Sequence, residues 1–275
     1  MKFWKKAFDL YINSSFHVGL ALVAFTLVTI MEFGLSPDFD LLMFVFFGTI
    51  TSYNFVKYAG IAKLHHPSLV RNLRLIQIFS FFCFLALVYY SLQQELEILM
   101  AAGFFGFLTA LYALPVFKGR TNLRGVKGVK VFVIAITATG VSVVLPLLNH
   151  PAIPVHNIIV EFLQRILLII VLMLPFEIRD LKFDSPDLYT FPQVLGVKKT
   201  KIMGYILLVL MFLLEFLKIG VKIPNLGGLL AIGLIAAFFL IKSEEDQGKY
   251  YASFWVESAP FFWLGAWFLI SVAAS

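Results

Sequence analysis

Acidic side chains collect at one point of the chain, directly after a long apolar run. Asp180, Asp184 and Asp187 lie within eight positions in the segment LPFEIRDLKFDSPDLYTFPQVLGVKKTK. Asp180 and Asp184 are four residues apart, so a helix would place both carboxylates on one face, with Cβ atoms about 5–6 Å apart. Such a pair can share Mg²⁺, which typically joins one or two carboxylates to the phosphates of a substrate. The spacing therefore predicts a magnesium-dependent site for a diphosphate ester.

The same segment allows a plainer interpretation, in which its acids and bases neutralise each other. Arg179 and Lys182 flank the two four-spaced aspartates and can pair with them at a solvated helix end. Pro186 disfavours helical backbone at Ser185, so the helix is expected to end there and Asp187 to lie on the following turn. The spacing alone leaves both interpretations open.

A basic segment, FKGRTNLRGVKGVK, supplies groups that match phosphate. It carries Lys118, Arg120, Arg124, Lys127 and Lys130. Guanidinium and ammonium groups bind phosphate oxygens at close range. The bias of basic residues towards the cytoplasmic side of membrane proteins explains the same segment without a ligand. The two glycines of its last part, GVKGVK, lack the longer pattern of a phosphate-binding loop.

The whole chain has the composition of an integral membrane protein. Of its 275 residues, 60% are hydrophobic, 16% aromatic and only 14% charged, far from the averages of a soluble domain. The net charge of +6 follows from basic loops and requires no nucleic acid partner. The single cysteine, Cys83, excludes an internal disulfide and any multi-cysteine metal site.

Apolar stretches long enough to cross a hydrocarbon core of about 30 Å divide the chain. They cover approximately residues 16–33, 39–58, 74–92, 96–114, 129–148, 157–177, 202–220, 226–241 and 259–274. With a cytoplasmic N-terminus, 19 of the 22 basic residues fall on the cytoplasmic side, which leaves Arg165, Lys218 and Lys222 for the other face. We therefore expect an all-α polytopic membrane protein, a bundle of about nine transmembrane helices with its C-terminus outside.

We expect residues 1–275 to form a single transmembrane domain in a bacterial inner (cytoplasmic) membrane. The connections on the cytoplasmic side are longer and more charged than the others. Loops near 54–74, 115–130 and 177–201 are therefore the expected functional loops.

The segment IRDLKFDSPDLYTFPQVLG resembles the second aspartate-rich motif of the UbiA superfamily of intramembrane prenyltransferases. Residues that match are Arg179, Asp180, Asp184, Thr190, Pro192 and Gly196, with one residue fewer before the threonine and no intervening glycine. The segment LYALPVFKGRTNLR is similar to a second family region, and its matching residues are Tyr112, Pro115, Lys118, Arg120 and Thr121. The resemblance implies a nine-helix UbiA-like fold, an isoprenyl diphosphate substrate and Mg²⁺.

The first aspartate motif of that family is degenerate in this chain. Asn54 matches its leading asparagine, but Phe55, Tyr58 and Ala62 stand where acids are expected, and no acid lies between Asp40 and Glu95. With Asp180 and Asp184 alone, the charge balance supports one Mg²⁺ and argues against a second. Lys57 can replace the second cation by placing its ammonium against phosphate, or it can simply extend to the membrane interface.

Other charged residues lie near the ends of the expected helices. Glu257 stands without a nearby partner in sequence at the cytoplasmic start of the last span, so it is expected to face the same cavity as Asp180. Tyr112 and Asp187 are further expected cavity residues. In the outer half of the membrane, two pairs at helical spacing can each neutralise themselves, namely Glu161 with Arg165 and Glu215 with Lys218.

These observations predict a prenyltransferase, an enzyme of the class that transfers alkyl groups other than methyl. Asp180 and Asp184 are the expected catalytic and metal-binding residues. The expected diphosphate-binding residues are Asn54, Lys57, Lys118, Arg120, Arg124 and Arg179. The predicted partners are an isoprenyl diphosphate, a lipophilic acceptor (aromatic or lipid) and membrane lipid. The alternative is a catalytically inactive UbiA-like protein that binds or moves an isoprenoid lipid or supports a membrane complex.

Overall fold

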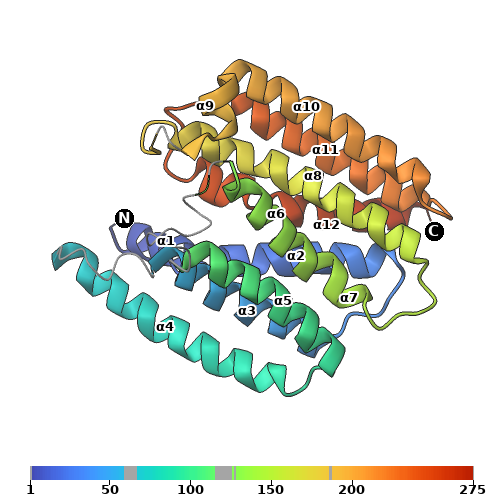
Figure 1. Cartoon of the computed structure of the whole chain (residues 1–275), viewed down its shortest axis with the longest axis horizontal. Coiled ribbons are helices and arrows are strands. Elements are labelled where there is room, and N and C mark those ends of the chain that lie inside the picture. The colour runs from blue at the N-terminus through green and yellow to red at the C-terminus, as the bar shows by residue number, and fades with distance from the viewer. Residues whose placement is uncertain (1, 59–66, 115–125, 127, 186–187, 275) are drawn as a thin grey trace.

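A computed structural model describes residues 2–58, 67–114, 126, 128–185 and 188–274, and all regular elements of this part are helices (Figure 1). The elements in chain order are α1 (Lys2–Asn13), α2 (Phe16–Glu32), α3 (Phe39–Tyr58), α4 (Pro67–Ser91), α5 (Leu96–Ala113), α6 (Lys130–Thr139), the π-helix η3 (Gly140–Val144), α7 (Leu145–Leu147), α8 (Val155–Asp180), α9 (Phe191–Leu195), α10 (Val197–Leu214), the 3₁₀ turn η5 (Glu215–Leu217), α11 (Ile223–Lys242), the π-helix η6 (Tyr251–Val256) and α12 (Ala259–Ala274).

Eight helices of the described chain are long and apolar enough to cross a membrane, and a bent pair raises the number to nine. That pair is α1 and α2, which meet at 56°. The bend lies at Ser15, whose φ of 62° is left-handed and unusual for a residue other than glycine. The predicted all-α polytopic architecture is confirmed. The first span was expected at α2, and the helix α1 before it was not predicted.

The long helices close into a ring of neighbours. α2 packs on α3, then contacts run through α5, α6, α8, α11 and α12 back to α2. α4 packs on α3, and α10 packs on both α8 and α11. The chain termini lie at opposite ends of this bundle (Figure 1). We call the end that carries α1 and α9 the N-terminal end, and the opposite end the C-terminal end.

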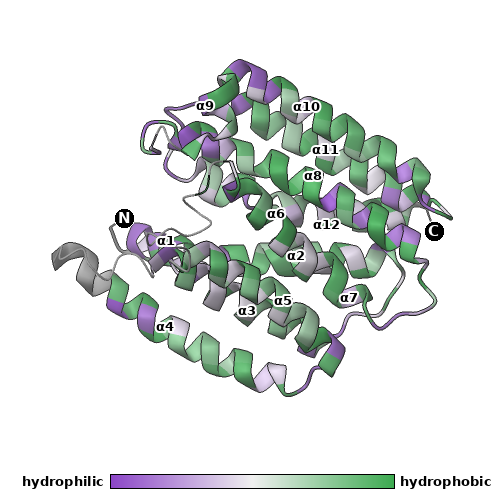
Figure 2. Cartoon of the chain, viewed as in Figure 1, coloured by the Kyte–Doolittle hydropathy of each residue, from purple (hydrophilic) through white to green (hydrophobic). Residues whose placement is uncertain are grey.

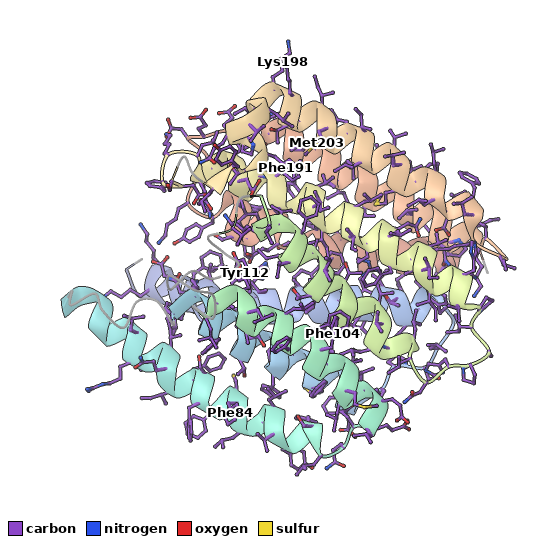
Figure 3. All side chains as sticks on the ribbon, in the orientation of Figure 1. Phe84, Phe104, Tyr112, Phe191, Lys198 and Met203 are labelled. Carbon is purple, nitrogen blue, oxygen red and sulfur yellow. The ribbon has the colours of Figure 1, made fainter. Side chains whose placement is uncertain are left out.

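Apolar residues cover the lengths of the helices, and polar residues concentrate at both ends of the bundle (Figure 2). α8 is the most enclosed span, with 61% of its apolar window buried, whereas the windows of α4 and α5 are only 11% buried. Phe84 on α4 and Phe104 on α5 are exposed (Figure 3). Because exposed aromatic side chains of this kind suit a lipid environment, α8 is the central helix and α4 and α5 form a lipid-facing surface.

The π-helix η3 interrupts the fifth expected span, where it contacts α2, α5 and α8. Gly140 makes this close approach possible, because an added Cβ would lie 2.1 Å from the ring of Phe105. Small residues commonly allow such helix contacts in membrane proteins.

Gly140→Ala is therefore expected to destabilise the protein by about 1–3 kcal/mol, the usual cost of overpacking a tight interior site. Unfolding in mixed detergent micelles would measure the change. Gly103→Ala in α5 is the matched control, because an added Cβ there meets no atom within 4 Å and alanine favours helix. Equal stability of the two variants would contradict this account of η3.

Candidate functional site

The end of α8 carries the predicted acids. α8 ends at Asp180, and Asp184 lies in the following turn, where its backbone N–H donates to the carbonyl oxygen of Asp180 at 2.8 Å. The helix thus ends one turn before Ser185, where the sequence placed its end. The chain turns because the carbonyl oxygen of Ser185 accepts hydrogen bonds from the backbone N–H of Leu188 (3.1 Å) and from Nε2 of Gln193 (3.0 Å).

Both acids have basic partners and are only partly exposed. Arg179 donates from Nε to Oδ1 of Asp180 at 2.7 Å and from Nη2 to Oδ2 at 3.2 Å. Asp184 pairs with Lys130 at the start of α6, with 3.5 Å between Nζ and Oδ2. The two carboxylates are 24% and 20% exposed, so neither extends freely into solvent.

Oδ2 of Asp184 is buried and accepts no hydrogen bond from the described residues. Buried carboxylate oxygens normally have such a partner. This oxygen is therefore available to a further donor or to a cation.

Glu177 is a third acid of this region and was not predicted from the sequence. Its side chain is 1% exposed, and its Oε2 accepts a hydrogen bond from the backbone N–H of Phe191 at 3.3 Å. It interacts electrostatically with Lys130, Asp184 and Asp180. Its position three residues before Asp180 on the same helix was a usable signal, since residues at that spacing lie on one face.

Polar side chains of other helices converge on the same region. Glu257, between η6 and α12, interacts electrostatically with Lys57 of α3 and with Arg179 of α8. Tyr53 of α3 interacts with Glu257 and Arg179 and also with Tyr112 of α5. Figure 3 shows Tyr112 on the inner part of the bundle. We call Tyr53, Lys57, Tyr112, Arg179 and Glu257 the Glu257 cluster.

Lys57 is the least engaged cation of the cluster. Its Nζ donates to the backbone carbonyl of Asn13 at 3.3 Å and lies 5.4 Å from the ring centroid of Tyr58. No carboxylate of the described chain lies within ion-pair distance of this ammonium. Two of its three hydrogens are therefore available to another acceptor.

Asn54, the remaining match to the first family motif, is fully hydrogen-bonded within the protein. Its Oδ1 accepts from the hydroxyl of Ser15 at 2.6 Å, and its Nδ2 donates to the carbonyl of Ser14 (2.9 Å) and the hydroxyl of Ser80 (2.8 Å). Asn54 thus connects the α1–α2 bend to α3 and α4. A contact from this amide to a diphosphate would require the loss of one of these bonds.

The helix α1 is also tied to the connection between α11 and η6. Asp9 accepts hydrogen bonds from Lys249 and, at 2.7 Å, from the hydroxyl of Tyr250. The bond to Asp9 raises the pKa of Lys249 above its ordinary value. α1 is thereby held across the N-terminal end, next to the Glu257 cluster. Four predicted site residues, Lys118, Arg120, Arg124 and Asp187, lie outside the described residues.

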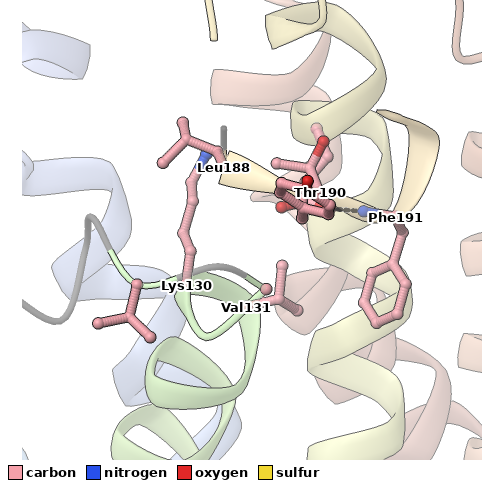
Figure 4. A pocket seen from close by; sticks show the side chains of 9 residues that line it. Lys130, Val131, Leu188, Thr190 and Phe191 are labelled. Carbon is pink, nitrogen blue, oxygen red and sulfur yellow. Dashed lines mark hydrogen bonds between the residues drawn. The ribbon is translucent and has the colours of Figure 1, made fainter. Parts of the chain in front are cut away.

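A small pocket lies beside the acids, lined by residues that include Lys130, Glu177, Thr190 and Phe191 (Figure 4). Its volume of about 30 Å³ is room for a single water molecule. No group of three or more histidine, cysteine, aspartate or glutamate side chains in the described chain has the geometry of a metal site. Carboxylate oxygens such as those of Asp180 and Asp184, including Oδ2 of Asp184, are of the type that one Mg²⁺ takes as ligands together with water and phosphate.

Comparisons with known proteins bear on the fold. No protein-family model matches the sequence, and no curated protein matches it. A solved structure described as digeranylgeranylglyceryl phosphate synthase in membranes is similar, with a TM-score of 0.59 and 16% sequence identity over 99% of this chain and 100% of that chain. The chain therefore has the fold of a UbiA-type prenyltransferase, as the sequence resemblance predicted.

Proposed function

We propose that the chain is an intramembrane prenyltransferase that moves an isoprenyl group from an isoprenyl diphosphate to a lipophilic acceptor, aromatic or lipid. The observation that supports this most is the convergence of acids and bases from four elements at one end of a prenyltransferase-like fold. α8 contributes Asp180 and Arg179, α3 contributes Lys57, and α6 contributes Lys130, while Glu257 follows η6. Such a mixed cluster suits a metal-bound or cation-bound diphosphate.

Each charged group has a distinct proposed role. Asp180 and Asp184 would hold one Mg²⁺, whose charge would offset that of the diphosphate. Arg179, which pairs with Asp180 in the structure, would bind a phosphate oxygen. Lys57 and Lys130 bind further phosphate oxygens. We also propose that phosphate oxygens are bound by basic residues of the connection between α5 and α6, namely Lys118, Arg120 and Arg124.

The reaction depends mainly on electrostatic stabilisation of the leaving group. The bond between the allylic carbon and the diphosphate oxygen breaks, pyrophosphate leaves with the electron pair, and the acceptor bonds to the allylic carbon and loses a proton. The rings of Tyr53 and Tyr112 stand next to the charged groups. Their π faces would stabilise positive charge on the allylic fragment.

The bias of basic residues supports a cytoplasmic position for the N-terminal end, in a bacterial inner membrane. The isoprenyl diphosphate would then enter from the cytoplasmic side, with its chain in the membrane. Termini at opposite ends of the bundle agree with nine crossings (Figure 1).

A second function is favoured by a specific observation, the pairing of both acids with basic residues. Asp180 is held by Arg179 and Asp184 by Lys130, and the first aspartate motif has no acid. A protein that binds an isoprenoid lipid without turning it over would need no metal and would keep these pairs intact.

An activity assay of the full chain separates the two functions. Purified protein would be incubated with geranyl, farnesyl and geranylgeranyl diphosphate, with and without Mg²⁺, across aromatic and lipid acceptors. Metal-dependent release of pyrophosphate with a prenylated product supports the transferase. Saturable binding of the diphosphate without product across the whole panel favours the binding protein.

Lys57→Met is expected to weaken the affinity for isoprenyl diphosphate by about tenfold, because one charge-assisted hydrogen bond to phosphate is lost. Equilibrium binding with a non-hydrolysable diphosphate analogue measures this directly. Lys198→Met is the matched control, since Lys198 is exposed and points away from the bundle (Figure 3). Equal affinities of wild type and the Lys57 variant would show that Lys57 does not bind the diphosphate.

A further inference from the structure

The C-terminal end of the bundle contains a network of buried charges. Glu161 accepts from Nη2 of Arg165 at 2.7 Å and from Nζ of Lys218 at 2.8 Å, and Glu215 accepts from the same Nζ at 2.7 Å. These side chains are at most 7% exposed. The two pairs that the sequence treated as separate are one network, because Lys218 bridges both glutamates.

Glu32 at the end of α2 adds a third carboxylate to this network. It interacts electrostatically with both glutamates, yet it is only 4% exposed and forms no ion pair within the described residues. Its Oε2 and the Oε1 of Glu215 are buried without a hydrogen-bond partner in the described chain. Three carboxylates therefore face two buried cations, Arg165 and Lys218. An unpaired carboxylate of this kind is costly to bury.

The unpartnered oxygens belong to residues that line a pocket of about 190 Å³. This volume corresponds to about six water molecules at about 30 Å³ each, so it admits a small polar group. Glu32, Glu215, Lys218 and Asn225 line it, and Lys222 is exposed at its edge, with Nζ 3.4 Å from the carbonyl oxygen of Glu32.

The surroundings distinguish among possible cations. A chelated metal is disfavoured, because no three carboxylates of the described chain have metal-site geometry. An ammonium group instead donates up to three hydrogen bonds to separate acceptors, which matches the two free carboxylate oxygens. Apolar residues lie at the same pocket, with Ile219 65% and Val221 41% exposed. An apolar rim next to an exposed lysine suits the boundary between a phospholipid head group and its acyl chains.

We propose that this pocket binds a phosphoethanolamine head group of a membrane lipid, with its ammonium on Glu32 and Glu215 and its phosphate on Lys222. The site lies at the end of the bundle opposite Asp180 and Asp184. It does not depend on the proposed prenyl transfer. In the expected orientation the lipid belongs to the outer leaflet.

Calorimetric titration of the full chain in detergent tests this assignment with short-chain phosphatidylethanolamine. Short-chain phosphatidylcholine is the matched ligand, because its trimethylated nitrogen has no N–H donor. We expect the ethanolamine lipid to bind at least about tenfold more tightly, the effect of losing a charge-assisted hydrogen bond. Equal binding of the two lipids would overturn the proposal. This comparison uses the wild-type protein, so its result does not depend on whether a variant folds.

Variants then test which residue binds the ammonium of the head group and which binds its phosphate. Glu32→Gln should weaken ethanolamine-lipid binding by about tenfold, whereas Glu97→Gln, at an exposed acid outside the pocket, should leave it unchanged. Lys222→Met should weaken the binding of the lipid but leave the binding of free ethanolamine unchanged. Unchanged lipid binding by a folded Glu32→Gln protein contradicts the ammonium site. Free O-phosphoethanolamine that binds as tightly as the lipid would overturn the assignment to a membrane lipid.

Discussion

Asp180→Asn is expected to lower kcat/KM for prenyl transfer by about 10²–10³-fold, the usual effect of removing one electrostatic contact to a developing charge. The substitution keeps the shape of the side chain and one hydrogen-bond acceptor for Arg179, but it removes the negative charge that would hold Mg²⁺. The loss should therefore appear together with a higher Mg²⁺ requirement. Initial rates of pyrophosphate release at several Mg²⁺ concentrations measure both.

The matched control for that experiment is Asp246→Asn. Asp246 also forms an ion pair, with Lys182, but its side chain is 91% exposed. Its loss should leave the rate unchanged, because exposed ion pairs contribute little. If Asp180→Asn retained full activity with an unchanged Mg²⁺ dependence, the metal site at the end of α8 would be wrong. Asp184→Asn is expected to behave like Asp180→Asn, because its Oδ2, which accepts no hydrogen bond from the described residues, is the other proposed ligand.

The membrane-spanning helices were predictable because each must satisfy its own backbone in lipid, which requires long apolar runs. The helix α1 was not, since its apolar residues are interspersed with Lys5, Lys6 and Asp9. Its position depends on the left-handed turn at Ser15 and on hydrogen bonds from Tyr250 and Lys249 near the other end of the chain. Contacts between such distant residues leave no local pattern in the sequence.

The location of the acids was predictable, because Asp180 and Asp184 directly follow a long apolar run. Their predicted placement on one helical face was wrong, since α8 ends at Asp180 and Asp184 lies in the following turn. Asn54 shows the limit, because its partners Ser14 and Ser80 come from other elements and use its whole amide group. The link between Glu161 and Glu215 was also not predictable from the sequence, because only the fold brings Lys218 between them.

The two ends of the bundle use charge differently. At the N-terminal end, the charged side chains are partly exposed: Asp180 is 24%, Asp184 20% and Lys130 18% exposed. Their ion pairs can therefore rearrange around a ligand. At the C-terminal end, Arg165 is fully buried and Glu161 is 2% exposed. Breaking a buried pair leaves an uncompensated charge, whereas a partly exposed pair can exchange partners at little cost. Ligand exchange is therefore expected at the first end and structural rigidity around Arg165 at the second.

Arg165→Met is accordingly expected to lower the free energy of unfolding by about 3–5 kcal/mol, the cost of removing one partner from a buried ion pair. The guanidinium donates from Nη1 to the carbonyl of Phe25 at 2.9 Å and from Nη2 to the hydroxyl of Thr29 at 3.1 Å. It also lies 4.5 Å from the ring centroid of Trp263. Its loss would therefore remove contacts of α8 with α2 and α12. It would also leave Lys218 as the only cation paired with Glu161 in the described chain.

Unfolding by SDS in mixed micelles would measure this loss, with Arg74→Met on the exposed side of α4 as the control. The double variant Glu161→Gln with Arg165→Met should recover part of the stability, because it also removes one of the buried carboxylates that would otherwise share Lys218 as their cation. A double variant less stable than the single one by the full cost of Glu161→Gln would show that the two charges act independently. An Arg165→Met protein as stable as the Arg74 control would show that the packing of α2, α8 and α12 does not depend on the guanidinium.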